Sequence, residues 1–99
     1  MTYWVSFSKT GIGEVIRERA YDSIVKARRY AANVLKTEDF QWASIHKSKD
    51  ARYHIETIDL GSKNRYRQIY GIVSRYDTKS RRFVQYVLNP NGTLGRRMD

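Results

Sequence analysis

The first part of the chain alternates apolar and polar residues in a way that predicts a β-hairpin. Residues 3–8 place an apolar side chain at every second position, which is the period of a strand with one buried face. The Thr-Gly-Ile-Gly segment at 10–13 is a natural hairpin loop, because glycine tolerates the positive φ that tight turns require. A second extended run follows at 14–21. We expect this run to place Ile16 and Ala20 on its inner face, and Arg17 and Arg19 on its outer face.

The next segment, residues 22–36, has the spacing of an amphipathic helix. Asp22 or Ser23 is suited to cap its start, since either side chain accepts hydrogen bonds from unpaired backbone amides. On a helical projection one face collects apolar side chains, which predicts the side that meets the core. The apolar face consists of Ile24, Ala27, Ala31, Val34 and Leu35, and the opposite face of Lys26, Arg29, Asn33 and Lys36.

A second hairpin is expected after the helix, formed by residues 40–48 and 52–60. Pairing Ile45 with Ile55 gives this hairpin a core face of Ala43, Ile45, Tyr53 and Ile55. The same register gathers His46, His54 and Glu56 on the opposite face, and these are the only 2 histidines of the chain. Such a set can ligate a metal or transfer protons, but half-exposed polar residues of a strand give the same pattern. A slip of one residue would separate the three, so both interpretations stay open.

A third hairpin is predicted from residues 65–76 and 81–88, with Ser74 paired to Phe83. Its apolar face would consist of Ile69, Val73, Val84 and Leu88. The Asn-Pro-Asn-Gly segment at 89–92 is a strong turn signal, since proline suits the second position and glycine the left-handed one. A short last strand is expected at 93–96.

The other face of this third hairpin carries aromatic side chains, and arginines crowd its ends. Tyrosines on a sheet with a basic rim are typical of proteins that bind single-stranded nucleic acid, since bases stack on rings and phosphates pair with cations. The alternative is that the tyrosines cover a second apolar layer, the helix included. Both interpretations fit the sequence.

These elements together predict the fold class. A chain of 99 residues is long enough for one modest core, so we expect a single domain, residues 1–99. We expect an α+β fold, in which an antiparallel sheet of four to six strands carries one principal helix at about 22–36.

The net charge indicates which class of molecule the protein would bind. Lysine and arginine total 19 against 10 acidic residues, which gives a formal charge of +9 and a pI near 10.0. The excess is larger in residues 51–99, with 10 basic and 4 acidic side chains, than in residues 1–50, with 9 and 6. Such a balance favours polyanionic partners through steering and counterion release. The alternative is a basic protein whose charge serves only solubility.

The sequence lacks the features of several other classes of protein. No apolar run is long enough to span a membrane, and the N-terminal residues do not have the pattern of a signal peptide. The chain has no cysteine, so disulfides and thiolate metal sites are excluded. We therefore expect a cytoplasmic protein without membrane contact.

No motif indicates a catalysed reaction. The sequence has no Walker loop, no His-Glu-x-x-His and no nucleophile elbow, and its carboxylates are scattered. We expect a protein that is not an enzyme and that uses no cofactor and no metal. The enzymatic alternative is a metal-free ribonuclease, in which cations stabilise the charge of the transition state.

Residues 3–36 resemble the arm-type, AP2-like DNA-binding domain of phage-type integrases. In that family a strand ending in an aromatic residue, here Tyr21, precedes a helix of alternating alanine and basic residues, here residues 25–32. The family has three strands before its helix, whereas this chain offers two and adds several strands afterwards. The resemblance implies a sheet that enters the DNA major groove, with Arg17 and Arg19 on its outer face.

A second resemblance is to RelE-like toxins, which are small basic ribonucleases. It rests on Tyr-Arg-Gln-Ile-Tyr at 66–70, on the hairpin that follows, and on a basic tail with Arg96 and Arg97. Those toxins begin with a strand and two helices, and this chain does not offer the second helix. The resemblance implies RNA cleavage.

The leading hypothesis is a binding protein that engages nucleic acid, DNA or RNA, or a machine that carries nucleic acid. The alternative is a phage-encoded inhibitor of the anti-CRISPR type, which binds a nuclease or nucleoprotein, and a RelE-like toxin comes third. A homodimer is compatible with an unpaired strand edge. The candidate nucleic-acid-binding residues are Arg17, Arg19, Arg28, Arg29, Arg65, Arg67, Arg75, Arg81 and Arg82, with Tyr66, Tyr70 and Tyr76 as stacking residues.

Overall fold

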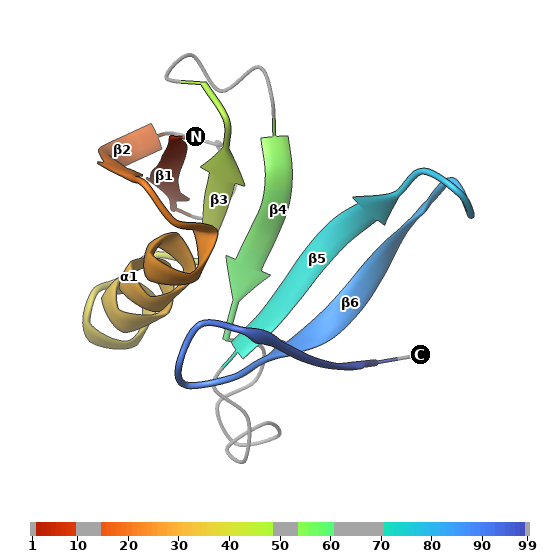
Figure 1. Cartoon of the computed structure of the whole chain (residues 1–99). Coiled ribbons are helices and arrows are strands. Elements are labelled where there is room, and N and C mark those ends of the chain that lie inside the picture. The colour runs from red at the N-terminus through yellow and green to blue at the C-terminus, as the bar shows by residue number, and fades with distance from the viewer. Residues whose placement is uncertain (1, 10–14, 49–53, 61–70, 99) are drawn as a thin grey trace.

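The computed structural model is one antiparallel sheet with one α-helix packed on part of it (Figure 1). It describes residues 2–9, 15–48, 54–60 and 71–98, with the side chains of 15–18 left aside. The fold is therefore α+β, as predicted, but the sheet has 7 strands instead of four to six. The elements are β1 (Tyr3–Ser8), β2 (Val15–Tyr21), α1 (Ile24–Thr37), β3 (Trp42–His46), β4 (His54–Asp59), β5 (Gly71–Asp77), β6 (Arg82–Leu88) and β7 (Leu94–Arg97).

The strand order is β2-β1-β3-β4-β5-β6-β7, so β1 lies inside the sheet. It pairs with β2 on one side and with β3 on the other, where Val5 lies opposite Ile45 and Phe7 opposite Ala43. The chain reaches β3 from the outer strand β2 by way of α1. This connection lays the helix over the sheet, and the later strands extend the sheet beyond it (Figure 1).

Helix α1 begins and ends close to the predicted residues. Ser23 is its N-cap and accepts a hydrogen bond from the backbone amide of Lys26, while Glu38 closes the last turn through a bond of 2.8 Å to the carbonyl oxygen of Val34. The predicted division of its faces is confirmed: one side is buried and the basic side is exposed. Buried alanines on the inner side keep the helix close to the strands. These are Ala27, Ala31 and Ala32.

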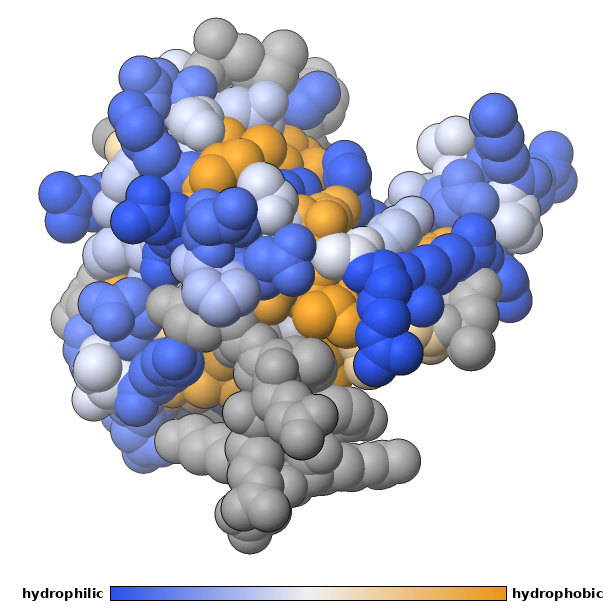
Figure 2. Space-filling model, turned by 60° about the horizontal axis from the view of Figure 1, so that its bottom comes forward, coloured by the Kyte–Doolittle hydropathy of each residue, from blue (hydrophilic) through white to orange (hydrophobic). Residues whose placement is uncertain are grey.

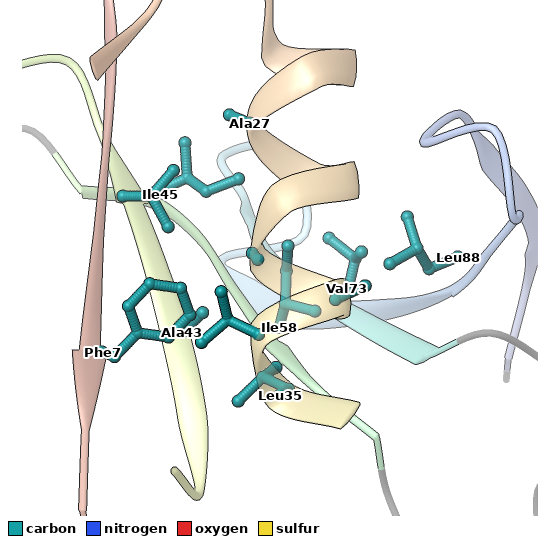
Figure 3. Close-up of a cluster of buried hydrophobic side chains, with 12 residues drawn as sticks. Phe7, Ala27, Leu35, Ala43, Ile45, Ile58, Val73 and Leu88 are labelled. Carbon is teal, nitrogen blue, oxygen red and sulfur yellow. The ribbon is translucent and has the colours of Figure 1, made fainter. Parts of the chain in front are cut away.

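The core lies between α1 and strands β1, β3, β4 and β5. Figure 3 shows side chains from the sheet, among them Phe7, Ile45 and Ile58, gathered beneath the helix. The ring of Phe7 meets Tyr30 of the helix edge-on and stacks on Phe40, with centroids 5.7 and 5.2 Å apart. Fully burying large apolar side chains of this kind contributes about 1.5–3 kcal/mol each.

The register of β3 with β4 differs from the prediction. Ile45 lies opposite Glu56, not Ile55, and an irregularity then places His46 opposite His54. The register therefore places Glu56 and Ile58 toward the helix, where both are buried, while Ile55 lies at the irregularity and packs against the core in a partly buried position. The predicted core positions Ala43 and Ile45 are confirmed, Ile55 packs against the core but is only partly buried, and Tyr53 lies outside the described residues.

The face assignment of β2 is also wrong. Arg19 lies opposite Val5 and therefore on the helix side of the sheet, while Ala20 lies opposite Trp4 on the other side and is exposed. A charged side chain is tolerated there because β2 is the outermost strand of the sheet. Arg19 lies at the margin of the core and is itself exposed.

The β5–β6 hairpin keeps the predicted faces with a register shifted by two residues. Ser74 pairs with Gln85, and Phe83 pairs with Tyr76. Because the shift is even, the predicted apolar residues remain together, and Val73, Val84 and Leu88 are buried as expected, whereas Ile69 lies outside the described residues. The far end of this hairpin projects away from the helix (Figure 1).

The turn between β6 and β7 forms as predicted and packs against the helix. The amide of Gly92 donates to the carbonyl oxygen of Asn89 at 2.9 Å, and Gly92 has a φ of 92°, which a residue with a side chain rarely adopts. A Cβ atom on Gly92 would lie 2.8 Å from Cγ of Arg29 and would overlap the carbonyl oxygen of Val25. The turn therefore depends on glycine both for its conformation and for its contact with α1.

Within the described part of the chain, no helix has the length and apolar character needed to cross a membrane.

Candidate nucleic-acid interface

Two aromatic rings lie exposed at the projecting end of the β5–β6 hairpin. Tyr76 is 51% exposed and Phe83 is 64% exposed. They are directly paired across the two strands, and their ring centroids are 5.4 Å apart in an edge-to-face arrangement. Both belong to the sheet face opposite the helix, since they continue the alternation that starts at Ser74 and Gln85. We call the segment 76–83 the hairpin tip.

Exposed cations surround these rings. Lys79 and Arg81 lie in the turn of residues 78–81, and Arg82 begins β6. Arg81 has a φ of 55°, a left-handed conformation that costs a residue with a Cβ atom about 1–2 kcal/mol. Figure 2 shows this end of the molecule as a predominantly hydrophilic protrusion, whereas hydrophobic residues are exposed nearer the centre of the same face.

Asp77 is the acidic residue of the hairpin tip, and its carboxylate holds the turn together. It accepts hydrogen bonds from the Ser80 hydroxyl at 2.7 Å and from the backbone amides of Lys79 and Ser80 at 3.2 and 3.3 Å. The Ser80 hydroxyl and then the Lys79 amide hold the pKa of the Asp77 carboxyl below its usual value. The carboxylate therefore fixes the conformation of the turn, in which Lys79 and Arg81 are exposed.

A second basic surface lies along α1, on the opposite side of the molecule from the hairpin tip (Figure 1). Here a cavity of about 390 Å³ opens between the helix, the end of β2 and the β6–β7 turn. We call it the helix groove. Its lining residues are Tyr21, Lys26, Arg29, Tyr30, Asn33 and Pro90.

Arg19 packs on the two tyrosines of the helix groove. Its guanidinium carbon lies 5.6 Å from the centroid of Tyr21 and 5.3 Å from that of Tyr30, within the range of cation–π attraction. The two rings are 5.4 Å apart and tilted by 40°. Burial raises the pKa of the Tyr21 hydroxyl; Arg19 opposes this rise, and Tyr30 adds to it.

Arg28 does not belong to either surface, which corrects the prediction that it contacts nucleic acid. Its side chain is 7% exposed and forms a bidentate ion pair with Glu56, from Nε to Oε1 at 2.6 Å and from Nη2 to Oε2 at 3.1 Å. Its Nη1 donates to the carbonyl oxygen of Gly92 at 3.3 Å. Arg75 reaches the other side of the same carboxylate at 3.3 Å and stays 41% exposed. This cluster joins α1, β4, β5 and the β6–β7 turn.

The predicted pairing of His46 with His54 is confirmed, but Glu56 does not join them. Glu56 faces the helix, whereas the two histidines lie opposite each other and bond elsewhere. His46 Nε2 lies 3.0 Å from the Ser6 hydroxyl, and His54 Nε2 lies 2.9 Å from the Thr57 hydroxyl. Among the described residues, no three histidine, cysteine or acidic side chains are placed to hold a metal ion.

Several predicted residues fall outside what the structure describes. These are Arg65, Tyr66, Arg67 and Tyr70, together with the side chain of Arg17. The described residues place Arg19 and Arg29 at the helix groove and Tyr76, Arg81 and Arg82 at the hairpin tip. Arg75 contacts the buried carboxylate of Glu56, and its side chain remains partly exposed at the surface.

Some residues that form these surfaces are absent from the list of candidate binding residues, namely Tyr21, Lys26, Tyr30, Asn33, Lys79, Phe83 and Pro90. The sequence pattern places Lys26 on the basic face of the helix, Lys79 among the cations at the ends of the third hairpin, and Phe83 on the aromatic face of that hairpin. The contribution of Tyr21 and Tyr30 depends on how β2 packs beside α1, which no local pattern encodes.

No family model matches the sequence, and comparisons with curated proteins and with solved structures find no significant match. The chemistry of the two surfaces is therefore the basis on which a function can be proposed.

Proposed function

We propose that this protein binds nucleic acid through the hairpin tip. The observation that carries the proposal is the exposed ring pair, Tyr76 and Phe83, with cations on the turn beside it. Exposed rings provide stacking surface for unpaired bases, worth about 1–3 kcal/mol per base. Lys79, Arg81 and Arg82 provide charge for the backbone phosphates of the same strand.

The arrangement favours single strands over duplexes. Rings on the open face of a hairpin can stack on bases only if those bases are neither paired with a complementary strand nor stacked on their neighbours. The net charge of +9 then adds attraction that does not depend on sequence. The proposed role is binding without catalysis, since the sequence carries no motif that points to a reaction.

The exposure of Phe83 also supports a second candidate function. An apolar ring on a projecting hairpin is typical of the residues that anchor protein–protein contacts. An inhibitor that targets a nuclease or nucleoprotein would use the same tip, with its arginines against acidic protein surface or bound RNA. This alternative corresponds to the anti-CRISPR type of activity.

The test is binding of fluorescently labelled RNA and DNA, single- and double-stranded, measured by anisotropy at about 0.15 M salt. The variant Tyr76→Ser/Phe83→Ser removes the rings and leaves every charge in place. We expect it to bind single strands at least about tenfold more weakly, since two stacking contacts are lost. Lys47→Ser, which removes an exposed cation after β3, is the control and should bind nearly as the wild type does.

Two results would contradict the proposal. Equal binding by the ring variant and the wild type would show that the tip rings do not contact bases. If the wild-type protein itself binds no nucleic acid at this salt concentration, its positive charge does not form a nucleic-acid-binding site, and the protein-targeting alternative is favoured.

A further inference from the structure

The helix groove has the size of a small-ligand site. Its volume of about 390 Å³ lies within the range of roughly 300–1,000 Å³ that such sites occupy in proteins. Segments distant in sequence form it: the end of β2, the exposed side of α1 and the turn before β7. The groove is thus a product of the folded chain and not of one element.

The groove carries cationic charge that its surroundings neutralise only in part. Among the described residues, Arg29 makes no hydrogen bond or ion pair, and its stem lies beside the Gly92 turn. Arg19 is held by the rings of Tyr21 and Tyr30, not by a carboxylate. Lys26, which lines the groove, donates to Asp22 at 3.3 Å in a pair with both side chains mostly exposed. Exposed pairs of this kind contribute at most about 1 kcal/mol and exchange readily with an incoming anion.

The walls of the groove suit a flat ring. Tyr21 and Tyr30 contribute two aromatic rings tilted by 40°, over which the Arg19 guanidinium lies, and Pro90 adds an apolar surface from the β6–β7 turn. Asn33 contributes an amide, which can donate and accept at the edge of a heterocycle. A simple anion would contact the cations but not the rings, the proline or the amide.

We propose that the helix groove binds a nucleotide, with its base against Tyr21 and Tyr30 and its phosphate at Arg29 and Lys26. The ligand combines the two features that the lining residues complement, a planar heterocycle and a phosphate. This site lies apart from the hairpin tip and does not depend on it (Figure 1). A protein with both sites would hold a nucleotide unit on the helix side while the tip engages a strand.

The experiment is an amide NMR titration of the full chain with AMP and, in parallel, with UMP, adenosine, ribose 5-phosphate and inorganic phosphate. We expect saturable shifts for residues of α1 and the β6–β7 turn. AMP should bind at least several-fold more tightly than adenosine, ribose 5-phosphate or phosphate, since each of these lacks one of the two features.

Arg29→Gln tests the phosphate contact and keeps most of the side-chain stem. We expect about a tenfold loss of AMP affinity, the effect of removing one charge-assisted hydrogen bond. Lys36→Gln is the matched control, since it removes a cation from the same helix outside the groove, and it should leave AMP affinity unchanged. The unperturbed amide spectrum of each variant verifies that it is folded.

Three results would overturn the inference: AMP binding no tighter than inorganic phosphate, shifts that avoid the groove, or equal losses in Arg29→Gln and Lys36→Gln. The tip variant Tyr76→Ser/Phe83→Ser separates the two proposals. It should bind AMP as the wild type does even though it loses oligonucleotide binding. Failure of either site is thereby visible without reference to the other.

Discussion

Arg28 and Glu56 are charged, yet both are as buried as the apolar residues of the core. Glu56 is fully buried, and the Arg28 guanidinium donates to both of its carboxylate oxygens as well as to the Gly92 carbonyl. Charged groups are tolerated in such surroundings only when they are paired and hydrogen-bonded. The pair therefore selects this packing of α1 on β4, because other registers would leave one of the two charges alone.

The first prediction concerns this pair. We expect Arg28→Met to lower the free energy of unfolding by about 3 kcal/mol, because it leaves the Glu56 carboxylate buried with only the more distant, half-exposed Arg75. Urea denaturation measures this loss.

Replacing both partners tests the reason. Arg28→Met/Glu56→Leu removes both charges and should recover most of the stability, to within about 1 kcal/mol of the wild type. Arg29→Met, one position along the helix and exposed, should have little effect. A double variant as unstable as Arg28→Met would indicate that the pair matters for its shape and not for its charge.

At the scale of elements, the β6–β7 turn joins the far edge of the sheet to the helix. Asn89 and Thr93 close the turn through their backbones at 3.0 Å, and Asn91 Oδ1 accepts from the amide of Thr93 at 3.1 Å. Gly92 then lies directly on α1, and its carbonyl oxygen accepts from Arg28. The turn thus positions Pro90 at the helix groove as well.

The second prediction is that Gly92→Ala destabilises the protein by about 2–3 kcal/mol, because a side chain is strained at this φ and its Cβ would overlap the helix backbone. Thermal or urea unfolding measures the loss.

Gly92→Asn separates the two causes, since asparagine tolerates a left-handed backbone but brings the same Cβ. We expect it to be nearly as unstable as Gly92→Ala. A much milder effect of asparagine would assign the cost to the backbone conformation and would argue against tight packing of the turn on α1.

At the scale of the whole molecule, the charge of +9 is distributed over separate surfaces. Part of it lies at the helix groove and part at the hairpin tip, and the structure places these at opposite sides (Figure 1). One straight segment of strand that lies along the tip would therefore not reach the groove cations. Only the cations in contact with phosphates release counterions on binding.

The third prediction follows from this separation. If the tip binds a single strand, Arg81→Ser should lower the slope of log Kd against log salt by about 0.7, the share of one phosphate contact. Anisotropy titrations over a salt series measure the slope. Arg29→Ser, an equal charge change at the helix groove, is the control and should alter the slope less. Equal reductions in both variants would mean that oligonucleotides bind to the charge as a whole.

Much of the fold was predictable because the relevant signals are local. The apolar period marked the helix and its exposed face, Ser23 was one of two proposed caps, and the Asn-Pro-Asn-Gly segment specified a turn with a left-handed glycine. Position Arg28 also carried a signal, since it lies between Ile24 and Ala31 on the apolar side of the helix, where a charge requires a partner. Its assignment to a nucleic-acid surface was wrong for that reason.

What the sequence by itself determined is the set of elements, the α+β class and the strong positive charge. The tertiary structure decided which face of β2 and β4 meets the helix. It thereby decided on which side of the sheet Arg19, Glu56 and the two histidines lie. Register depends on partners distant in the sequence, and one residue of slip reverses a whole strand. The two surfaces have the same origin: stacked rings and grouped cations come from separate elements, and only their packing brings them together.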